Sequence, residues 1–372
     1  MLNKKRMADA SALLRKGNLD ALVVSVSMDT LYLSGLYMKP DERFKGFVIV
    51  PHEVGGNYGF AFVPALYKHE FEEFAGGDIP FYLWKDEDWF YDSMKKGLDD
   101  FGVPKGGVIA FNDSTLAIEA IEFSKRWGYQ LENGADIFSS LRLIKDEEEI
   151  GYLKKVGEIT DAALRDVAKF IKPGITERQV LDFLYKQFAL HGADAPGADA
   201  WGIIAKSENA AVPHYSKMDC ELAVGDSLLI DVGCNYKGYH SDVTRTVFIG
   251  EPDEERRKVY EIVREAQQAG INIVRPGVKA CEVDKAVRDV VESAGYGPQF
   301  FHRTGHGIGL AIHEAPYISS AHQTVLKEGM AFSVEPGIYL PGKFGVRIED
   351  IVVVTATGCE TMTKFPKTLS VV

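Results

Sequence analysis

The sequence predicts two α/β domains, the second of which contains an internal repeat. The chain has 372 residues, more than one hydrophobic core usually organises, and 46% of them are hydrophobic, enough for two cores. Residues 1–138 alternate short apolar runs with amphipathic helices, which is typical of an α/β domain. In residues 139–372, two helices followed by a hairpin occur twice. We therefore expect a smaller domain over 1–138 and a larger, repeated one over 139–372.

The first domain is expected to contain strands in three apolar runs, at 19–26, 46–50 and 106–111, and a helix near 114–127. Its charged and aromatic residues show no spacing that indicates a particular chemistry. We interpret this domain as a scaffold or an oligomerisation module.

The second domain is expected to begin with two helices. Asp146 can cap the first, with Glu149 three residues later in a capping-box pattern, and the helix should end at 172–174, Lys-Pro-Gly. Thr176 and Gln179 form the same pattern at the start of the next helix.

The same order of elements then returns. A helix from about 254 should end at 275–277, Arg-Pro-Gly, and another should end at Gly295. Aligning Pro173 with Pro276 gives an offset of 103 residues, and a hairpin candidate follows each proline at nearly the same distance. These features indicate an internal repeat.

Each predicted hairpin carries a pair of acids. Residues 227–249 read as two strands around a turn at 235–238, with Asp231 and Asp242 equidistant from its centre. In a regular hairpin these two carboxylates would be directly opposite, with Cβ atoms ~5 Å apart, where like charges destabilise a sheet. We therefore expect a positive charge between them.

The second hairpin, around Gly342, places Glu335 and Glu349 at equal distances from the turn. Glu335 follows Pro276 by 59 residues and Asp231 follows Pro173 by 58, so a pseudo-twofold relation would bring all four acids together. Two divalent ions would neutralise their four charges, and the sequence thus predicts a two-metal site. The alternative is two exposed acid pairs with accidental symmetry, or ordinary strand-end polarity at 349–350.

Histidines supply the nitrogen ligands that such a site could use. His302, His306 and His313 lie in the glycine-rich segment HRTGHGIGLAIHEAP, whose glycines allow the backbone to approach a site closely. This segment lacks the GxGxxG spacing and the strand–turn–helix context of a dinucleotide loop. His214 precedes the first hairpin and, by itself, reads as an ordinary loop histidine.

These segments together resemble the creatinase/aminopeptidase P/prolidase group of metallopeptidases. HRTGHGIGLAIHE is similar to the signature of the group, and DVG…SDVTRT, SVEPGIY and GVRIED are similar to its other ligand segments in order and spacing. The resemblance covers most of the chain. It implies a pita-bread catalytic domain with a pseudo-twofold repeat, preceded by a smaller creatinase-like α/β domain.

The resemblance also implies the roles of individual residues. Two divalent ions would bind to Asp231, Asp242, His306, Glu335 and Glu349; Mn²⁺ is the first choice, and Co²⁺, Fe²⁺ or Zn²⁺ could substitute for it. The ions would lower the pKa of a bridging water, so that hydroxide attacks the Xaa-Pro bond. Glu335 would carry a proton to the leaving nitrogen, and His214 and His313 would steady the carbonyl. Positions that contact the substrate or support the ligands would be Arg347, His302, Tyr317 and Arg245.

One position departs from the pattern of the group. Tyr317 stands where several prolidases resemble one another in having arginine, so recognition of the free carboxylate of a dipeptide is an open question. An Xaa-Pro dipeptidase and an Xaa-Pro aminopeptidase that acts on longer peptides both remain candidates. The resemblance further implies a homodimer.

Composition limits the partners and the compartment. A net charge of −12 disfavours nucleic acid and anionic membranes as partners, and no apolar stretch is long enough for a membrane span. The four cysteines, which form no CxxC pair, and the absence of a signal-peptide pattern favour a cytoplasmic protein with reduced thiols. Two other functions compete with the peptidase: a metal-free amidinohydrolase, which would lack the full ligand set, and a non-catalytic peptide- or protein-binding module.

Overall fold

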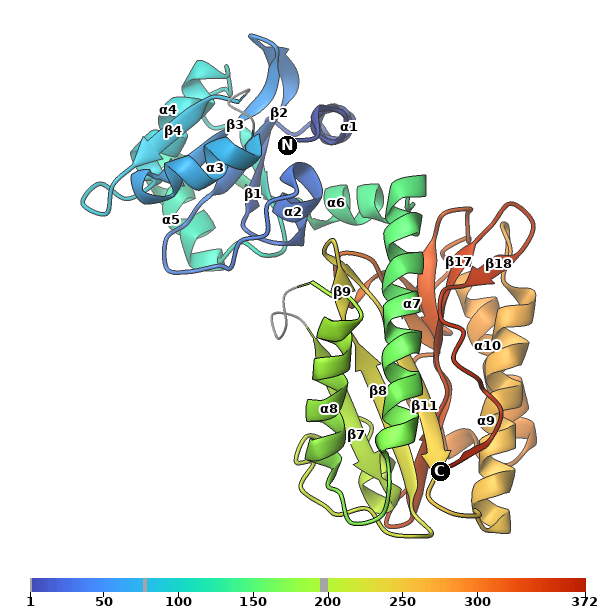
Figure 1. Ribbon diagram of the computed structural model, residues 1–372. Helices are drawn as coiled ribbons and strands as arrows, with labels where there is room; N and C mark the ends of the chain where they lie inside the picture. Colours follow the sequence, from blue (N-terminus) through green and yellow to red (C-terminus); the bar gives the residue numbers. More distant parts are fainter. Residues whose placement is uncertain (1, 76–78, 195–199) are drawn as a thin grey trace. The chain divides into compact units, whose positions relative to one another are not determined.

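The computed structural model describes residues 2–75, 79–194 and 200–372 (Figure 1). The chain forms two compact units, Met1–Arg142 and Leu143–Val372. The boundary predicted at 138/139 lies within helix α6, Ala135–Arg142, the last element of the first unit. The two units are described separately below.

The first unit contains a mixed six-stranded sheet in the order β4-β3-β2-β1-β5-β6. The three predicted strands are confirmed as β1, β2 and β5, and the predicted helix is confirmed as α5. The strands are β1 Ala21–Ser25, β2 Gly46–Val54, β3 Asn57–Pro64, β4 Phe81–Trp84, β5 Val108–Phe111 and β6 Gln130–Asn133. The other helices are α1 Lys4–Gly17, α2 Met28–Ser34, α3 Lys68–Ala75 and α4 Tyr91–Asp100, and α5 is Ala117–Trp127. An aromatic core that includes Phe60, Phe62, Phe90 and Phe123 holds sheet and helices together.

The second unit begins with the expected helix pair, α7 (Glu147–Phe170) and α8 (Glu177–Leu190). Both capping boxes are confirmed: the backbone N–H of Glu149 donates to the Asp146 carboxylate at 2.9 Å, and the backbone N–H of Asp146 donates to the Glu149 carboxylate at 2.8 Å. Thr176 and Gln179 exchange the equivalent bonds at 3.2 and 2.8 Å. These caps satisfy N–H groups that a helix start leaves without intrahelical partners.

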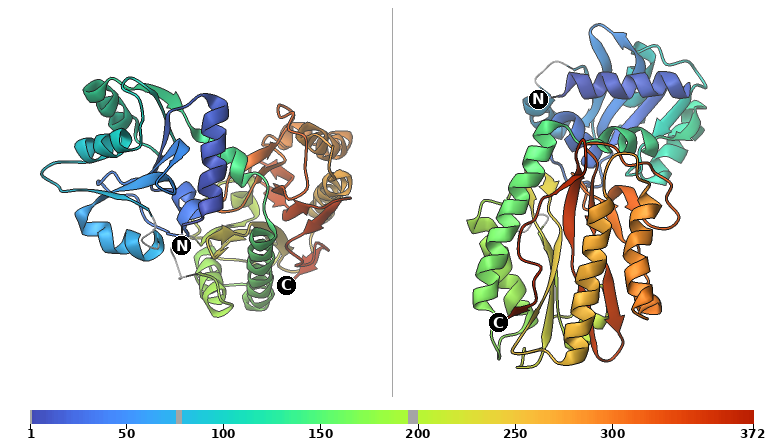
Figure 2. Two further views of the ribbon diagram at one scale, coloured as in Figure 1. Left: turned by 90° about the horizontal axis from the view of Figure 1, so that it is seen from above. Right: turned by 90° about the vertical axis from the view of Figure 1, so that its right-hand side faces the viewer.

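The repeat is confirmed at the level of elements. A second helix pair, α9 (Glu254–Ile273) and α10 (Ala280–Ser293), follows the first sheet, and α10 ends before Gly295, whose φ of +86° lies in the left-handed region. Figure 2 shows both helix pairs on the outside of the strands of this unit. Each pair packs on its own sheet through a separate cluster of buried aliphatic and aromatic side chains.

The two sheets of this unit have the orders β19-β11-β8-β7 and β13-β12-β14-β17-β18, and two small hairpins, β9-β10 and β15-β16, extend from them. The strands of the first half are β7 Trp201–Lys206, β8 Ser227–Gly233, β9 Asn235–Tyr236, β10 Tyr239–His240 and β11 Val243–Phe248. Those of the second half are β12 Gly305–Gly307, β13 Glu314–Ile318, β14 Ala331–Val334, β15 Gly337–Leu340, β16 Phe344–Arg347, β17 Asp350–Val354, β18 Cys359–Thr361 and β19 Ser370–Val371.

Asp231 and Asp242 are not directly opposite each other in the first hairpin. The register that we predicted for this hairpin is therefore wrong. Asp231 in β8 pairs with Thr244 in β11, because the tip of the hairpin lies at 237–238, one residue later than the assumed centre. The same register puts Asp242 across from Gly233, two positions from Asp231. Residues two apart share a face of a strand, so both carboxylates still lie on one side of the sheet.

The second acid pair has the predicted register. β15 pairs with β16 around Gly342, and β14 pairs with β17 in the same register. Glu335 lies between β14 and β15, and Glu349 lies at the opposite position between β16 and β17. The two acids therefore occur where the strands separate and side chains can converge on a site.

Among the residues that the structure describes, no helix combines the length and the apolar content that crossing a bilayer requires.

Candidate active site

A cleft of about 680 Å³ within the second unit contains the predicted site. Side chains from both halves of the repeat line it, as expected if the pseudo-twofold relation brings the acid pairs together. The polar lining consists of His214, Asp231, Asp242, His302, Arg303, His306, His313, Glu335, Tyr339, Arg347 and Glu349. The apolar lining consists of Trp201, Ile203, Val212, Pro213, Phe301 and Ile312.

Three acids converge on the ring of His306. Its Nε2 lies 3.3 Å from Oε1 of Glu335 and 3.6 Å from Oδ2 of Asp242. Asp242, His306 and Glu349 each offer a ligand atom within 4.8 Å of the others. Asp231 lines the same cleft, with one oxygen bonded to the Arg347 guanidinium. The structure thus brings the five expected metal ligands to one place.

Three buried carboxylates of the cleft each have one oxygen that the described residues leave without a donor. Asp231 Oδ1, Asp242 Oδ1 and Glu349 Oε1 are buried and have no hydrogen-bond partner among the described residues. The other oxygen of Glu349 accepts from Thr244 Oγ1 at 2.7 Å, so the side chain is held in place. Unpaired buried carboxylate oxygens are costly, and divalent ions with oxygen and imidazole ligands would pair with them. The residues therefore fit a centre for divalent metal ions.

The electrostatics of the protein without metal lead to the same conclusion. Burial, reinforced by Glu349 and Asp231, raises the pKa of Asp242 well above its ordinary value. Burial and the neighbouring acids likewise raise the pKa of Glu349, and burial raises that of Glu335 to about 7. Without a compensating cation these groups resist ionisation, whereas metal binding requires their ionised forms.

The local backbone fixes the orientation of His306. Gly305 precedes it in β12, and a Cβ there would lie 1.9 Å from the carbonyl oxygen of Ser333, so only glycine allows this close strand pairing. His306 Nδ1 lies 3.1 Å from the carbonyl oxygen of Gly307. Because a carbonyl can only accept, Nδ1 carries the proton and Nε2 directs its lone pair at the acids. Burial lowers the pKa of His306 to about 3, which keeps the ring neutral.

Arg347 is a buried structural cation behind the acids. It binds Asp231, and it donates to Tyr339 Oη at 2.8 Å and to Thr244 Oγ1 at 3.1 Å. His302 lies 2.9 Å from the same Tyr339 hydroxyl, so His302 and Arg347 meet at one phenol. Sequence reasoning missed Tyr339, because a tyrosine in a strand gives no signal of its polar partners.

His313 and His214 line the cleft as exposed side chains. The ring of His313 lies edge-on to that of His306, with centroids 4.2 Å apart. Partial desolvation in the cleft and the charge of Arg303 lower the pKa of His313, which favours the neutral ring. The positions of both histidines suit hydrogen bonding to a ligand in the cleft.

Tyr317 and Arg245 do not lie where the sequence analysis expects them, at the substrate or beside the carboxylates of the metal ligands. Tyr317 is not among the residues that line the cleft; its ring lies under the guanidinium of Arg303, 4.8 Å from centroid to Cζ. Sequence reasoning did not select Arg303. Arg245 pairs with Asp350 at 2.7 Å and donates to the backbone carbonyl of Glu349, so it anchors the strand end rather than the ligand carboxylates.

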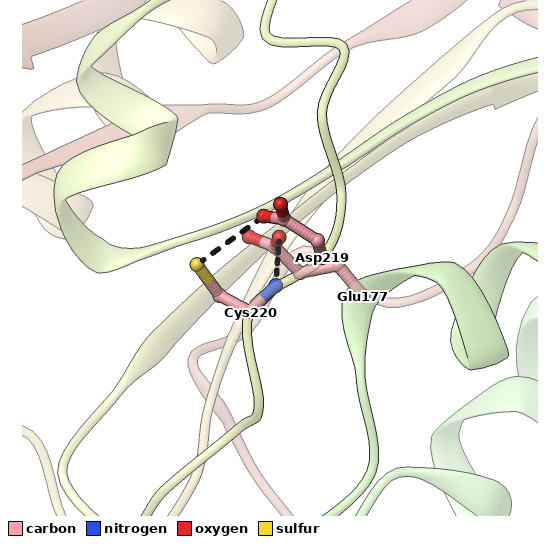
Figure 3. Close-up of side chains that lie close together, drawn as sticks. All are labelled: Glu177, Asp219 and Cys220. Carbon is pink, nitrogen blue, oxygen red and sulfur yellow. Dashed lines mark hydrogen bonds between the residues drawn. The ribbon is translucent and has the colours of Figure 1, made fainter.

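A second group of possible ligands, Glu177, Asp219 and Cys220, is shown in Figure 3, and none of the three lines the cleft. The buried Glu177 accepts hydrogen bonds from Lys206 N and Asn209 Nδ2, both at 2.8 Å, and from Cys220 N at 3.3 Å. Its charge is thus satisfied at the start of α8, where the helix dipole also favours an anion. These hydrogen bonds connect the start of α8 to Lys206, Asn209 and Cys220.

Known proteins share both the sequence and the fold. Residues 151–356 match metallopeptidase family M24. The chain is 36% identical to a probable dipeptidase PepE of Mycobacterium tuberculosis, over 99% of this chain and 96% of that protein. It is 34% identical to an Xaa-Pro dipeptidase of Pyrococcus furiosus, over 98% and 99%. The crystal structure of dipeptidase PepE from Mycobacterium ulcerans, 36% identical, superposes with a TM-score of 0.92 and covers 99% of this chain and 97% of that one. The expected pita-bread fold and family are therefore confirmed: the chain belongs to metallopeptidase family M24.

Proposed function

We propose that this protein is a metal-dependent exopeptidase that hydrolyses the bond between an amino-terminal residue and proline. The observation that carries the proposal is that three buried carboxylates of one cleft, those of Asp231, Asp242 and Glu349, each have an oxygen without a partner. The ring of His306 lines the same cleft, with Nε2 3.6 Å from the other oxygen of Asp242. The relatives named as dipeptidases and as Xaa-Pro dipeptidase support the substrate class.

Two divalent ions would be held by Asp231, Asp242, His306, Glu335 and Glu349. Two ions match four carboxylates in charge, and the oxygen-rich donor set, with a single imidazole, favours Mn²⁺. When bound, the ions would supply an acidified water and a positive charge for the oxygen of the attacked carbonyl.

The side chains of the protein would perform the remaining steps. Glu335 accepts a hydrogen bond from Ser333 Oγ at 3.0 Å, which leaves its other oxygen to receive a proton from water and pass it to the leaving nitrogen. The neutral ring of His313 donates an N–H to the carbonyl oxygen, and His214 contacts the substrate from the facing loop.

The apolar side of the cleft suits a proline ring. Val212, Pro213, Phe301 and Ile312 line it, and Phe301 is 64% exposed, so a ligand can cover it. A proline nitrogen in a peptide bond has no N–H, so recognition of this residue depends on the shape of its ring. Burying that ring against these side chains would favour proline over flexible residues.

The test compares Ala-Pro with Ala-Ala as substrates for protein stripped of metal by a chelator and then reloaded with Mn²⁺. We expect turnover of Ala-Pro that is lost on chelation and restored by about two Mn²⁺ per chain. Full activity after thorough chelation would contradict the proposal, and so would a reloaded protein that cleaves the Xaa-Pro bond neither in Ala-Pro nor in the longer Ala-Pro-Ala.

We also propose a cytoplasmic homodimer. The four cysteines are free thiols, as a reducing compartment requires, and the resemblance supports a dimer. Light scattering coupled to size exclusion would measure the mass, and a single 41.2 kDa species would contradict the dimer.

A further inference from the structure

The metal-ligand candidate Glu349 lies between two strand ladders rather than within one. It follows β16, which pairs with β15, and precedes β17, which pairs with β14. Three hydrogen bonds to β11 hold it instead. Thr244 Oγ1 donates to its carboxylate at 2.7 Å, its own N–H donates to the Thr244 carbonyl at 3.0 Å, and Arg245 Nη1 donates to its carbonyl. Because β11 begins directly after Asp242, these bonds set the spacing between ligands from the two halves of the repeat.

Arg245 is a buried cation that joins three segments of the chain. Its exposed fraction is 2%. Nη1 donates to the carbonyls of β11 and of Glu349, and Nη2 donates to the Asp350 carboxylate at 2.7 Å. Nη2 also donates to the Phe365 carbonyl at 2.7 Å, and Nε donates to the Pro366 carbonyl at 3.2 Å. A guanidinium can serve these partners because its five donors are spread over three nitrogens, whereas the donors of a lysine share one.

Asp350 balances this cation on the side of the strand opposite to Glu349, since successive side chains of an extended chain point to opposite faces. Asp350 is fully buried. It accepts hydrogen bonds from Thr363 Oγ1 at 2.7 Å and from Gln267 Nε2 at 3.0 Å, and it pairs with Lys367 Nζ at 3.0 Å. Asp350 thus connects the start of β17 to α9 and to residues near the carboxyl end of the chain.

Residues 363–367, here called the anchor segment, belong to the stretch after β18 that runs between α7 and α9 (Figure 1). Asp161 of α7, which is buried, accepts the N–H groups of two consecutive residues of this segment at 2.7 and 2.9 Å. The Tyr260 hydroxyl of α9 donates to the carbonyl of its last residue at 3.2 Å. The anchor segment is therefore fixed from two helices. It lies outside the family match at 151–356, so that match by itself does not indicate a role for it.

We propose that Arg245, Asp350 and the anchor segment position Glu349 for metal binding, so that the affinity for Mn²⁺ depends on side chains that do not line the cleft. This inference rests on the proposed function, of which it uses only the metal centre. A carboxylate that is already held in place loses little conformational freedom when it binds an ion, and groups behind metal ligands affect affinity in this way. Arg245 and Asp350 are positioning residues, because neither is among the described residues of the cleft lining.

The experiment measures Mn²⁺ affinity from the electron paramagnetic resonance signal of free Mn²⁺, for wild type, Arg245→Lys and Asp350→Asn. Arg245→Lys keeps the charge but cannot bind all three segments. Each variant should bind Mn²⁺ about 10- to 100-fold more weakly, the usual effect of losing a group that supports a metal ligand. At saturating Mn²⁺ the KM for Ala-Pro should stay within about 3-fold of wild type, because the cleft lining is unchanged.

Asp226→Asn is the matched control. Asp226 is another half-buried-to-buried acid bonded to a lysine and a hydroxyl, Lys206 Nζ at 3.2 Å and Ser207 Oγ at 2.8 Å. It precedes β8 and lies five residues before Asp231, ~16 Å along the strand. We expect Asp226→Asn to lower stability and to leave Mn²⁺ affinity within about 2-fold of wild type.

The outcomes separate the inference from the function on which it rests. If wild type binds no Mn²⁺, the proposed metal centre fails and takes the inference with it. If wild type binds Mn²⁺ and Arg245→Lys binds it equally well, only the inference is overturned. The same holds if Asp226→Asn weakens binding as much as Asp350→Asn, because loss of stability alone would then explain the effect.

A milder variant decides if Arg245→Lys and Asp350→Asn do not fold. Thr363→Val is nearly isosteric and removes a single hydrogen bond to Asp350. It should weaken Mn²⁺ binding by about 3- to 10-fold, as expected for the loss of one hydrogen bond. Unchanged Mn²⁺ affinity in Thr363→Val would overturn the inference.

Discussion

Replacing Glu335 with glutamine should stabilise the protein when metal is removed. Burial raises the pKa of Glu335 from 4.5 to about 7, so the ionised side chain costs free energy in the folded state. A rise in the pKa from 4.5 to about 7 corresponds to about 3 kcal/mol. About 15% of the side chain is exposed to the cleft, and water screens part of this cost. We expect Glu335→Gln to raise the free energy of unfolding of the chelated protein by about 2 to 3 kcal/mol at pH 8.

The pH dependence has a definite sign. The pKa of Glu335 is higher in the folded state than in the unfolded state, so the folded state binds more protons between pH 4.5 and 7. The wild type therefore loses stability relative to the variant as the pH rises from 4.5 to 7. The advantage of the variant should be complete above pH 7 and fall below about 1 kcal/mol at pH 5. In Mn²⁺ the sign should reverse, because the variant lacks a ligand and gains less from metal binding.

Urea unfolding at pH 5 and pH 8, with chelator and with Mn²⁺, measures all four differences. Glu265→Gln, on the exposed face of α9, is the control for a change of one charge. A chelated Glu335→Gln protein that is less stable than wild type at pH 8 would refute the reasoning. An advantage of equal size at both pH values would refute it too, since it would show that the glutamate charge is not the cause.

Three further predictions concern other parts of the site. Asp242→Ala should lose bound metal and nearly all turnover, whereas His313→Ala should keep the metal and turn over slowly. Metal analysis together with kinetics checks both variants. A metal-free His313→Ala protein would contradict the assignment of Asp242 to the metal and of His313 to the substrate. Arg347→Met should lower the free energy of unfolding by roughly 3–5 kcal/mol in chelator, because it leaves Asp231 charged, buried and unpaired; an effect below about 1 kcal/mol in urea would contradict this. Gly305→Ala should lower both the melting temperature and the metal affinity, because its Cβ would push β12 away from β14; unchanged metal affinity by titration would contradict it.

Prediction from the sequence was most successful where local chemistry determines the structure. Asp146 with Glu149 and Thr176 with Gln179 cap helices through bonds between residues three apart, and the structure contains these bonds. Glu335 and Glu349 were paired correctly because the turn at Gly342 sets the register of the strands that follow. The first hairpin failed by one residue, since its turn gives no such unambiguous centre.

The sequence by itself determined the two α/β domains, the repeat, and the four acids that could share a metal site, because helix caps, strand alternation and acid spacing are properties of neighbouring residues. The choice of His306 as the fifth ligand came from the resemblance to the family. Only the tertiary structure decided which side chains face the cleft and what surrounds them. Arg303 on the ring of Tyr317, and Tyr339 between His302 and Arg347, join residues whose contact depends on how strands pack. The physical reason is that the environment of a charge depends on every segment that packs around it, and packing partners distant in the chain leave no periodic pattern in the sequence.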